Sequence, residues 1–206
     1  MTTDLWQEEI QRTIAESVRV ASSLREMAPK LSQAATIMAD SLRSGGRLFA
    51  LGNGGSAAQA QHVAAELVGR LEADRQPIPA IALTTDTSIL TAVGNDYGFE
   101  EIFARQLRAL ARRGDVVLAI STSGNSPNVL RALEAAREMS LKSVGLAGRT
   151  GGEMGKRADL CLCVGSDSTP RVQEAHLLIS HLLCSLVETA CLGERPRGGE
   201  NLPERS

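Results

Sequence analysis

The chain has 206 residues and a formal net charge of -2, from 22 lysine and arginine residues against 24 aspartate and glutamate residues. Hydrophobic residues make up 43% of the chain, which is typical of a globular protein and excludes an intrinsically disordered one. The balanced charge excludes the basic surface with which proteins hold nucleic acid, so an anionic ligand would need a local site. We find no signal-peptide pattern and no run of about 18 uncharged apolar residues, which predicts a cytoplasmic protein that does not enter a membrane.

Two amphipathic helices are predicted at the N-terminus. In residues 4–27 apolar residues recur every three or four positions, and a second helix follows Pro29 and stops at Gly45 and Gly46. The apolar faces are Trp6, Ile10, Ile14, Val18, Ala21 and Leu24 in the first helix and Leu31, Ala35, Met38 and Leu42 in the second. These faces must pack on the chain's own sheet or against another subunit, and the second arrangement predicts a homo-oligomer.

Beyond Gly46, short apolar runs alternate with helical segments. They are apolar on successive residues and bounded by glycine or polar turns, which is typical of strands buried on both faces of a parallel sheet. The runs are Leu48–Leu51, Pro79–Leu83, Val116–Ile120, Ser143–Leu146 and Leu160–Val164. We therefore predict an α/β fold: a three-layer α/β/α sandwich with a five-stranded parallel sheet of the flavodoxin-like type, preceded by the two N-terminal helices. A last helix is expected from about Pro170 to Leu192.

Residues 1–192 are expected to form one domain, because no internal linker or repeat interrupts them. The tail, residues 193–206, is rich in proline, glycine and charge, which predicts disorder. Cys161 and Cys163 alternate on the last apolar run and should share one face of a strand. A metal clip is one interpretation of this pair, but we favour reduced thiols in the core, because free cysteine packs as a small hydrophobe.

Two loops that follow predicted strands are candidates for phosphate binding. The first, Gly52–Ser56, has three glycines that let backbone N–H groups turn toward a ligand at the start of a helix. An ordinary strand-to-helix turn would look similar, so this loop is weak evidence alone. The second, Ser121–Ser126, places four hydroxyl groups before Pro127, which suits the first position of a helix.

The second loop favours phosphate more clearly. A capped turn requires only Ser126 and leaves Ser121, Thr122 and Ser123 unexplained, whereas hydroxyl and amide donors together can replace basic residues around an anion. Both loops lie at the carboxyl ends of strands, where ligands bind in open α/β sheets.

Four polar side chains suggest proton transfer. His62 and Glu66 are one turn apart on the helix after the first loop, a spacing that also suits two ligands of one zinc ion. Gln173 and His181 lie about two turns apart in the apolar last helix. A solvated pair and a hydrogen-bonded core histidine are the ordinary explanations. An aldose–ketose isomerase needs a base beside a carbonyl and an acid or metal at the enediol oxygen, and Glu66 and His181 supply these two chemical types.

Asn95 and Asp96 are the remaining candidates. They suit either a plain turn before a helix or a site at which Asp96 accepts sugar hydroxyl groups. A further difficulty concerns Glu66, because a zinc-bound carboxylate is a weaker base than a free one.

Together these motifs resemble those of the phosphoheptose isomerases (sedoheptulose 7-phosphate isomerases), a family with the sugar isomerase (SIS) fold. The resemblance covers essentially residues 1–192. It is carried by Gly52–Ser56, His62, Glu66, Asn95–Asp96, Ser121–Ser126, and Arg171–Glu174 with His181. It implies conversion of sedoheptulose 7-phosphate to D-glycero-D-manno-heptose 7-phosphate, an early step toward heptose in bacterial lipopolysaccharide or other surface glycans.

The resemblance also implies site residues and assembly. It implies a homotetramer with active sites between subunits and one zinc ion per subunit. The implied zinc ligands are His62, Glu66, Gln173 and His181, with Glu66 as the base and His181 as the acid. The implied substrate contacts are Asn53, Gly54, Gly55, Ser56, Glu66, Asn95, Asp96, Ser121, Thr122, Ser123, Ser126 and Gln173.

Two alternatives remain open from the sequence. A scaffold that binds the replication initiator protein shares the fold and much of the pattern, but it lacks the acid at the position of Glu66 and the imidazole at the position of His181, both of which this chain keeps. An isomerase of another phosphosugar is the second alternative. The chain departs from many of these isomerases at Thr150, where aspartate is common, and in the loop Asp167–Thr169, which bears on the substrate more than on the reaction.

Overall fold

The computed structural model describes residues 2–72 and 74–192, so the predicted disordered tail lies outside the described residues. The N-terminal helices are α1 (Thr2–Ser23) and α2 (Ala28–Arg43), joined by the short 3-10 helix η1 (Leu24–Met27). The strands are β1 (Leu48–Gly52), β2 (Ala80–Ala82), β3 (Val116–Ser121), β4 (Lys142–Ala147) and β5 (Leu160–Cys163). The connecting and final helices are α3 (Gly55–Val68), α4 (Thr87–Tyr97), η2 (Phe99–Glu101), α5 (Ile102–Leu110), α6 (Pro127–Glu138), α7 (Met154–Arg157) and α8 (Thr169–Leu192).

The five predicted strands form one parallel sheet in the order β2-β1-β3-β4-β5. Every residue of the central strands β1 and β3 is buried, as the runs of successive apolar residues predict. The edge strands β2 and β5 are shorter and only half-buried, since each has one neighbouring strand. The predicted fold class, a flavodoxin-like α/β/α sandwich, is confirmed.

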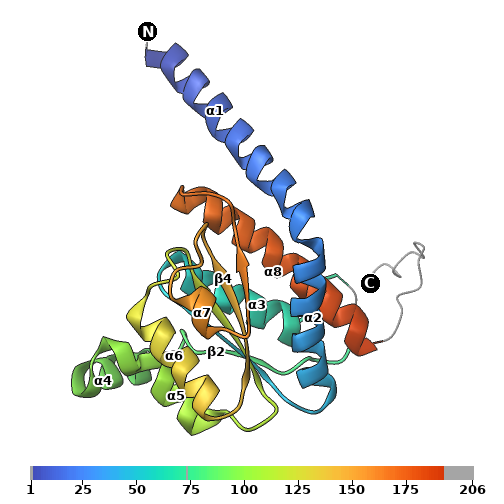
Figure 1. Ribbon diagram of the computed structural model, residues 1–206, viewed down its shortest axis with the longest axis vertical. Coiled ribbons are helices and arrows are strands. Elements are labelled where there is room, and N and C mark those ends of the chain that lie inside the picture. The colour runs from blue at the N-terminus through green and yellow to red at the C-terminus, as the bar shows by residue number, and fades with distance from the viewer. Residues whose placement is uncertain (1, 73, 193–206) are drawn as a thin grey trace, which may run out of the picture.

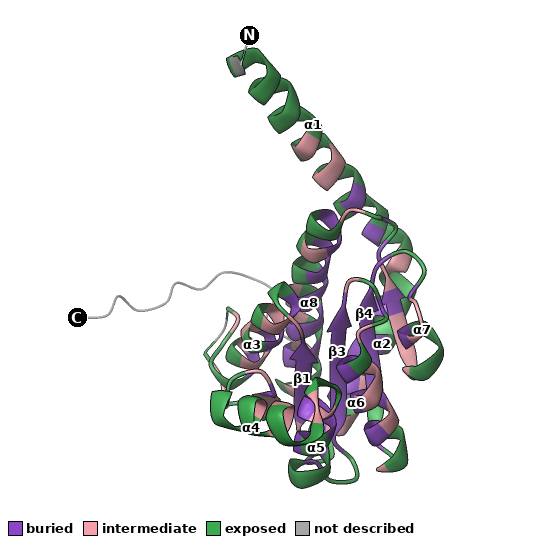
Figure 2. Ribbon diagram, turned by 90° about the vertical axis from the view of Figure 1, so that its left-hand side faces the viewer, coloured by how far each residue is buried: buried purple, intermediate pink, exposed green. Residues whose placement is uncertain are grey.

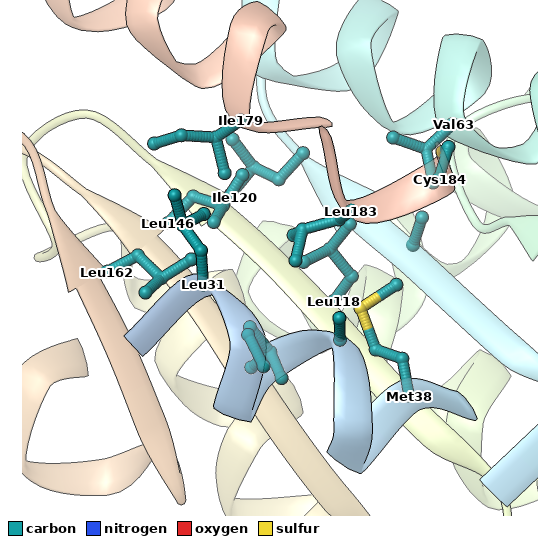
Figure 3. Close-up of a cluster of buried hydrophobic side chains, with 14 of the residues drawn as sticks. Leu31, Met38, Val63, Leu118, Ile120, Leu146, Leu162, Ile179, Leu183 and Cys184 are labelled. Carbon is teal, nitrogen blue, oxygen red and sulfur yellow. The ribbon is translucent and has the colours of Figure 1, made fainter. Parts of the chain in front are cut away.

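Helices cover both faces of the sheet (Figures 1 and 2). On one face α2, α3 and α8 pack over the sheet, in a core that includes Met38, Ile120 and Leu183 (Figure 3). On the other face α5, α6 and α7 pack against residues such as Phe49 and Val117. The chain therefore passes from β1 to one face through α3 and from β3 to the other through α6.

The last helix departs from one expectation. At 24 residues, α8 is long and apolar enough to cross a membrane by length and composition, whereas the sequence suggested no such segment. Its packing explains part of this composition, because Val172, Ile179, Leu183 and Val187 are buried against the sheet and neighbouring helices. Other leucines of the helix are exposed: Leu177, Leu178, Leu182 and Leu186.

Helix α1 extends away from the body of the molecule (Figure 1). Its C-terminal half is anchored: Val20 is buried, the Ser17 hydroxyl donates to Glu174, and Arg171 donates to the carbonyl of Thr13. The predicted apolar stripe is present but uncovered, with Trp6 66% and Ile10 57% exposed. Of the two arrangements open to this stripe, packing on the chain's own sheet is therefore not the one observed.

The four cysteines are free thiols. Cys161 and Cys163 share one face of β5, as predicted, with sulfurs 3.8 Å apart, well beyond the length of a disulfide bond. Burial raises the pKa of the Cys161 thiol to about 12, aided by the neighbouring Cys163. Both side chains are half-buried.

His176 is fully buried on α8, where its Nε2 donates to the carbonyl of Ala147 at the end of β4 over 3.1 Å. Burial of the imidazole lowers the pKa of His176 from its ordinary 6.5 to about 4, and the hydrogen bond to Ala147 offsets this only in part. The neutral ring thus attaches the first half of α8 to the sheet.

The depressed pKa of His176 predicts a loss of stability in acid. Between about pH 6.5 and pH 4 the unfolded chain protonates this residue and the folded chain does not, so the free energy of unfolding falls as pH falls, by up to about 3 kcal/mol. In the His176→Gln variant this part of the decline should disappear. Urea denaturation at a series of pH values measures it, and equal slopes for both proteins would contradict the assignment.

Candidate functional site

The two predicted phosphate loops meet at one place. They follow β1 and β3, which are neighbours in the sheet, with Gly52 paired in register with Ile120. The chain leaves these strands toward opposite faces, so the gap between the loops is the topological switch point of the sheet. In an open α/β sheet this crevice is where ligands bind.

The first loop depends on its glycines. Gly54 has φ of +55° and ψ of -121°, a conformation that L side chains rarely adopt, and it directly precedes α3. A Cβ atom on Gly55 would lie 2.5 Å from Nε2 of Gln173, so this glycine lets α8 approach the start of α3. Ser56 is buried in the first turn of the helix.

The second loop gathers its hydroxyl groups. The Ser121 hydroxyl lies 3.0 Å from that of Ser126 and 3.4 Å from that of Ser123. Ser126 occupies the N-cap position of α6 and Pro127 the start of the helix, as predicted, but the Ser126 side chain makes no capping hydrogen bond. Its hydroxyl therefore points into the hydroxyl cluster instead of capping the helix. An anion site requires such donors, together with helix N–H groups that no cap occupies.

A glycine turn after β4 supports this loop from behind. Gly124 has φ of +66°, and a Cβ atom there would lie 2.1 Å from the carbonyl oxygen of Gly151. The carbonyl of Thr122 accepts from the N–H of Gly148, and that of Gly124 accepts from the N–H of Met154. The close contact holds both loops in one fixed shape.

A polar cavity of about 270 Å³ opens beside the second loop. Its walls carry hydroxyl groups from Thr122, Ser123, Thr150, Ser166 and Thr169. Arg149 also lines it and is paired with Asp167 at 3.0 Å. This surface can hydrogen-bond a polyhydroxylated ligand with few charges.

The predicted proton-transfer residues converge from α3 and α8. Nε2 of His62 lies 2.8 Å from Nε2 of His181, and the same His62 nitrogen lies 3.4 Å from Oε1 of Glu66. All three side chains are half-buried. Since two imidazole nitrogens at this distance need either one proton or one cation between them, the lone pairs point to a common centre.

These three residues fit a metal ion. Within residues 2–72 and 74–192 they form the only group of three or more His, Cys, Asp or Glu side chains with ligand atoms within 4.8 Å of one another. The ligand nitrogens of two imidazoles on one tetrahedral zinc lie about 3.3 Å apart, somewhat farther than the 2.8 Å between Nε2 of His62 and Nε2 of His181 here. The donor set of two nitrogens and one carboxylate oxygen also suits zinc.

Gln173 lies between the cluster and the first loop. Its backbone carbonyl accepts from Nε2 of Gln59 at 2.7 Å, and its side chain packs on Gly55. Gln173 thus joins α8 to the start of α3. Its expected part in binding zinc or substrate stays a prediction.

Asn95 and Asp96 are not brought to this cluster. The interpretation as a turn before a helix is wrong, because both residues lie in the last turn of α4. Their side chains are exposed, and the Asn95 amide donates to Asp96 at 2.8 Å. In Thr87–Tyr97 the residues Ile89, Val93 and Tyr97 recur at the four-residue spacing of a helix, and the Asn-Asp pair, which is typical of turns, lies within this pattern.

Sequence reasoning missed a buried ion pair behind the cluster. Nε of Arg75 lies 3.1 Å from Oε2 of Glu188, and their side chains are 2% and 1% exposed. The Arg75 guanidinium also donates to the carbonyls of Glu66 and Leu67 at the end of α3. It therefore satisfies the helix terminus and ties α3 to α8. No local signal marks Arg75, because its partner lies far along the chain.

Asn128 was also missed. It is 1% exposed in the first turn of α6, and its side chain exchanges two hydrogen bonds of 2.8 Å with that of Asn53. Its place directly after the serine-rich loop, in a helix turn that is otherwise apolar, was the available signal.

The fold and the site together define a SIS-domain protein. The family model described as the SIS domain matches residues 13–148, which is more than half of the chain. A solved structure of a phosphoheptose isomerase from Neisseria gonorrhoeae superposes with a TM-score of 0.85 at 44% sequence identity, over 89% of this chain and 99% of that one.

Comparison with known sequences identifies the family within the SIS-domain proteins. A phosphoheptose isomerase of Geotalea daltonii is 53% identical over 189 residues, covering 91% of this chain and 98% of the relative. One of Rhodospirillum rubrum is 56% identical over 167 residues, covering 81% and 89%. The chain belongs to the phosphoheptose isomerase family, as the motifs predict.

The buried ion pair predicts a large loss of stability when it is broken. Arg75→Met should lower the free energy of unfolding by about 3–5 kcal/mol, because it leaves the Glu188 carboxylate buried without its cation. The double variant Arg75→Met/Glu188→Leu should recover part of this loss. Urea denaturation measures both. Arg43→Met, at an exposed pair with Asp40, is the matched control and should change stability little. An equally small effect of Arg75→Met would contradict the role given to the pair.

Proposed function

We propose that this chain isomerises sedoheptulose 7-phosphate to D-glycero-D-manno-heptose 7-phosphate. The observation that carries the proposal is the convergence of His62 and Glu66, on the helix α3 that begins at the first phosphate loop, with His181 on α8. The membership in the phosphoheptose isomerase family supports the same reaction.

One group of residues binds the phosphate, and a second group transfers the proton. The hydroxyl cluster of Ser121, Ser123 and Ser126 and the N-terminus of α3 hold the phosphate without a basic side chain. Glu66 removes a proton from C1 of the open-chain ketose and returns one to C2, so that an enediol forms and collapses to the aldose. His181 moves the proton between the two oxygens. The overall step is a rearrangement, with no atom gained or lost.

We assign a zinc ion to His62, Glu66 and His181, with Gln173 as the expected fourth ligand. Zinc, when bound, polarises the carbonyl and stabilises the enediol oxygen as a Lewis acid. A carboxylate that binds zinc is a weaker base, so Glu66 has to serve either as the ligand or as the base at the moment of proton removal.

We also propose a homotetramer with active sites between subunits. The uncovered stripe on α1 and exposed leucines on α8, including Leu178 and Leu182 next to His181, are supporting observations. Monomers rarely expose such patches. A partner subunit that covers them would lie close to the site, and it would give the exposed Asn95 and Asp96 a site to contribute to.

The product and its surroundings follow from this reaction. We propose that the enzyme acts in the cytoplasm, where the free thiols stay reduced, and supplies heptose for lipopolysaccharide or other surface glycans. An isomerase of another phosphosugar and a scaffold for the replication initiator protein are the competing functions. Turnover of sedoheptulose 7-phosphate by the purified protein separates the proposed function from both, and turnover of other phosphosugars separates the two competing functions from each other.

The base assignment predicts that Glu66→Gln lowers kcat by about 10²- to 10⁴-fold, because the amide cannot accept the proton. Folding by circular dichroism and inhibition by inorganic phosphate should persist, since Glu66 lies away from the phosphate loops. Conversion of sedoheptulose 7-phosphate measures the rate.

Zinc content in the same samples separates the two roles of Glu66. Retained zinc with lost turnover means that Glu66 is the base, and zinc lost together with turnover means that it is a ligand. Glu138→Gln, at an exposed position on α6, is the control and should keep full activity. Activity within tenfold of wild type in Glu66→Gln would sink the mechanism.

The assembly proposal predicts that Ile10→Asp/Ile14→Asp breaks the oligomer without unfolding the chain. The two carboxylates would be desolvated at a subunit interface but exposed in a lone subunit, where both positions are 57% exposed. Light scattering should show a smaller mass and circular dichroism an unchanged helix content. The control Arg12→Gln, on the same helix, should keep the wild-type mass; a double variant with that mass would contradict the proposal.

A further inference from the structure

The switch-point crevice is bridged by one side-chain pair. Nδ2 of Asn53 donates to Oδ1 of Asn128 at 2.8 Å, and Nδ2 of Asn128 donates to Oδ1 of Asn53 at 2.8 Å. Asn53 belongs to the loop after β1, and Asn128 belongs to the first turn of α6 after β3. The pair therefore joins the two phosphate loops directly.

Asn128 is the buried member of the pair, and both side chains use their oxygen and one N–H in it. Asn128 is 1% exposed, so its amide depends on Asn53 for its hydrogen bonds. An amide left buried without a partner is strongly disfavoured, and Asn53→Ala would leave the Asn128 amide in that state. Asn53 is half-buried, so Asn128→Ala would free its side chain to turn toward solvent. Each carboxamide has its oxygen and one N–H engaged by the other, so the Asn53 side chain already has its partner before any ligand arrives.

We infer that Asn128 is a positioning residue that sets the distance between the two phosphate loops. The strands fix the register of Gly52 against Ile120, but beyond that point α3 and α6 diverge to opposite faces of the sheet. The reciprocal hydrogen bonds between Asn53 and Asn128 hold the start of α3 and the start of α6 together across this gap. A ligand phosphate held by both loops requires their spacing to be set before binding.

The inference changes the part that Asn53 plays. The resemblance implies that Asn53 contacts substrate. The geometry adds that its side chain is held by Asn128, and this pairing leaves the second N–H and the second oxygen lone pair of Asn53 available to a ligand. Asn53 and Asn128 then act as one unit.

The inference rests on the proposed function of these loops in phosphate binding, and a double-mutant cycle tests it. Asn53→Ala and Asn128→Ala should each weaken binding of inorganic phosphate by about tenfold. The double variant should bind no more weakly than either single variant, because each change breaks the same unit. Calorimetry of inorganic phosphate gives the affinities, at a temperature where denaturant titration shows every variant folded.

Asn125→Ala is the matched control. Asn125 lies in the same loop, but it bonds to the carbonyl of Ser123 and the N–H of Glu153 and does not contact Asn53. Its effect should add to that of Asn53→Ala. If Asn128→Ala does not fold, Asn128→Ser takes its place in the cycle with the same expectation.

Additive losses from Asn53 and Asn128, or phosphate affinity unchanged in Asn128→Ala, would overturn the positioning role. Turnover of sedoheptulose 7-phosphate by the wild-type protein reports separately on the proposed function. A wild-type enzyme that turns over with additive losses refutes the pair alone, and a wild type that neither binds phosphate nor turns over refutes both.

Discussion

The divergence of the chain between β1 and β3 is the constraint on which the rest of this structure depends. A parallel sheet in the order β2-β1-β3-β4-β5 must send the connections after its two central strands to opposite faces. Both loops then open at the same edge, with a crevice between them. The site is polar rather than basic because a helix terminus and hydroxyl groups already face that crevice. The near-neutral net charge is therefore compatible with an anionic substrate.

The helices on the two faces of the sheet contribute differently to the site. The face of α3 and α8 holds the cluster of His62, Glu66 and His181, and contacts fix these helices at both ends: the packing of Gln173 on Gly55 at one end and the buried ion pair of Arg75 with Glu188 at the other. The face of α5, α6 and α7 is mainly a hydrophobic core behind the phosphate loop. Because both helices are held in place, the side chains of His62, Glu66 and His181 stay close together. Repulsion between the lone pairs of these side chains would otherwise push them apart.

The elements were predictable because their signals are local. Successive apolar residues identified β1 and β3, and Ser126-Pro127 identified the start of α6. The pairing of His62 with Glu66 also follows from helical spacing. Contacts that depend on packing were not predictable: Arg75 with Glu188, and Asn53 with Asn128, join segments whose proximity only the folded sheet creates. The composition of α8 shows the same limit, since it does not reveal which neighbours cover a helix.

The length of α3 bears on which phosphosugar fits. From Gly55 to Glu66 the helix rises about 16 Å, and the Glu66 side chain leans back toward the N-terminus by about one turn, roughly 5 Å. The carboxylate therefore lies about 11 Å from the N-terminus of the same helix, where we propose that the phosphate binds. A ligand that reaches both points must be an extended sugar phosphate of several carbons, because a triose phosphate is too short to place its reacting carbon there. The open-chain form of a seven-carbon sugar phosphate is long enough to satisfy this geometry.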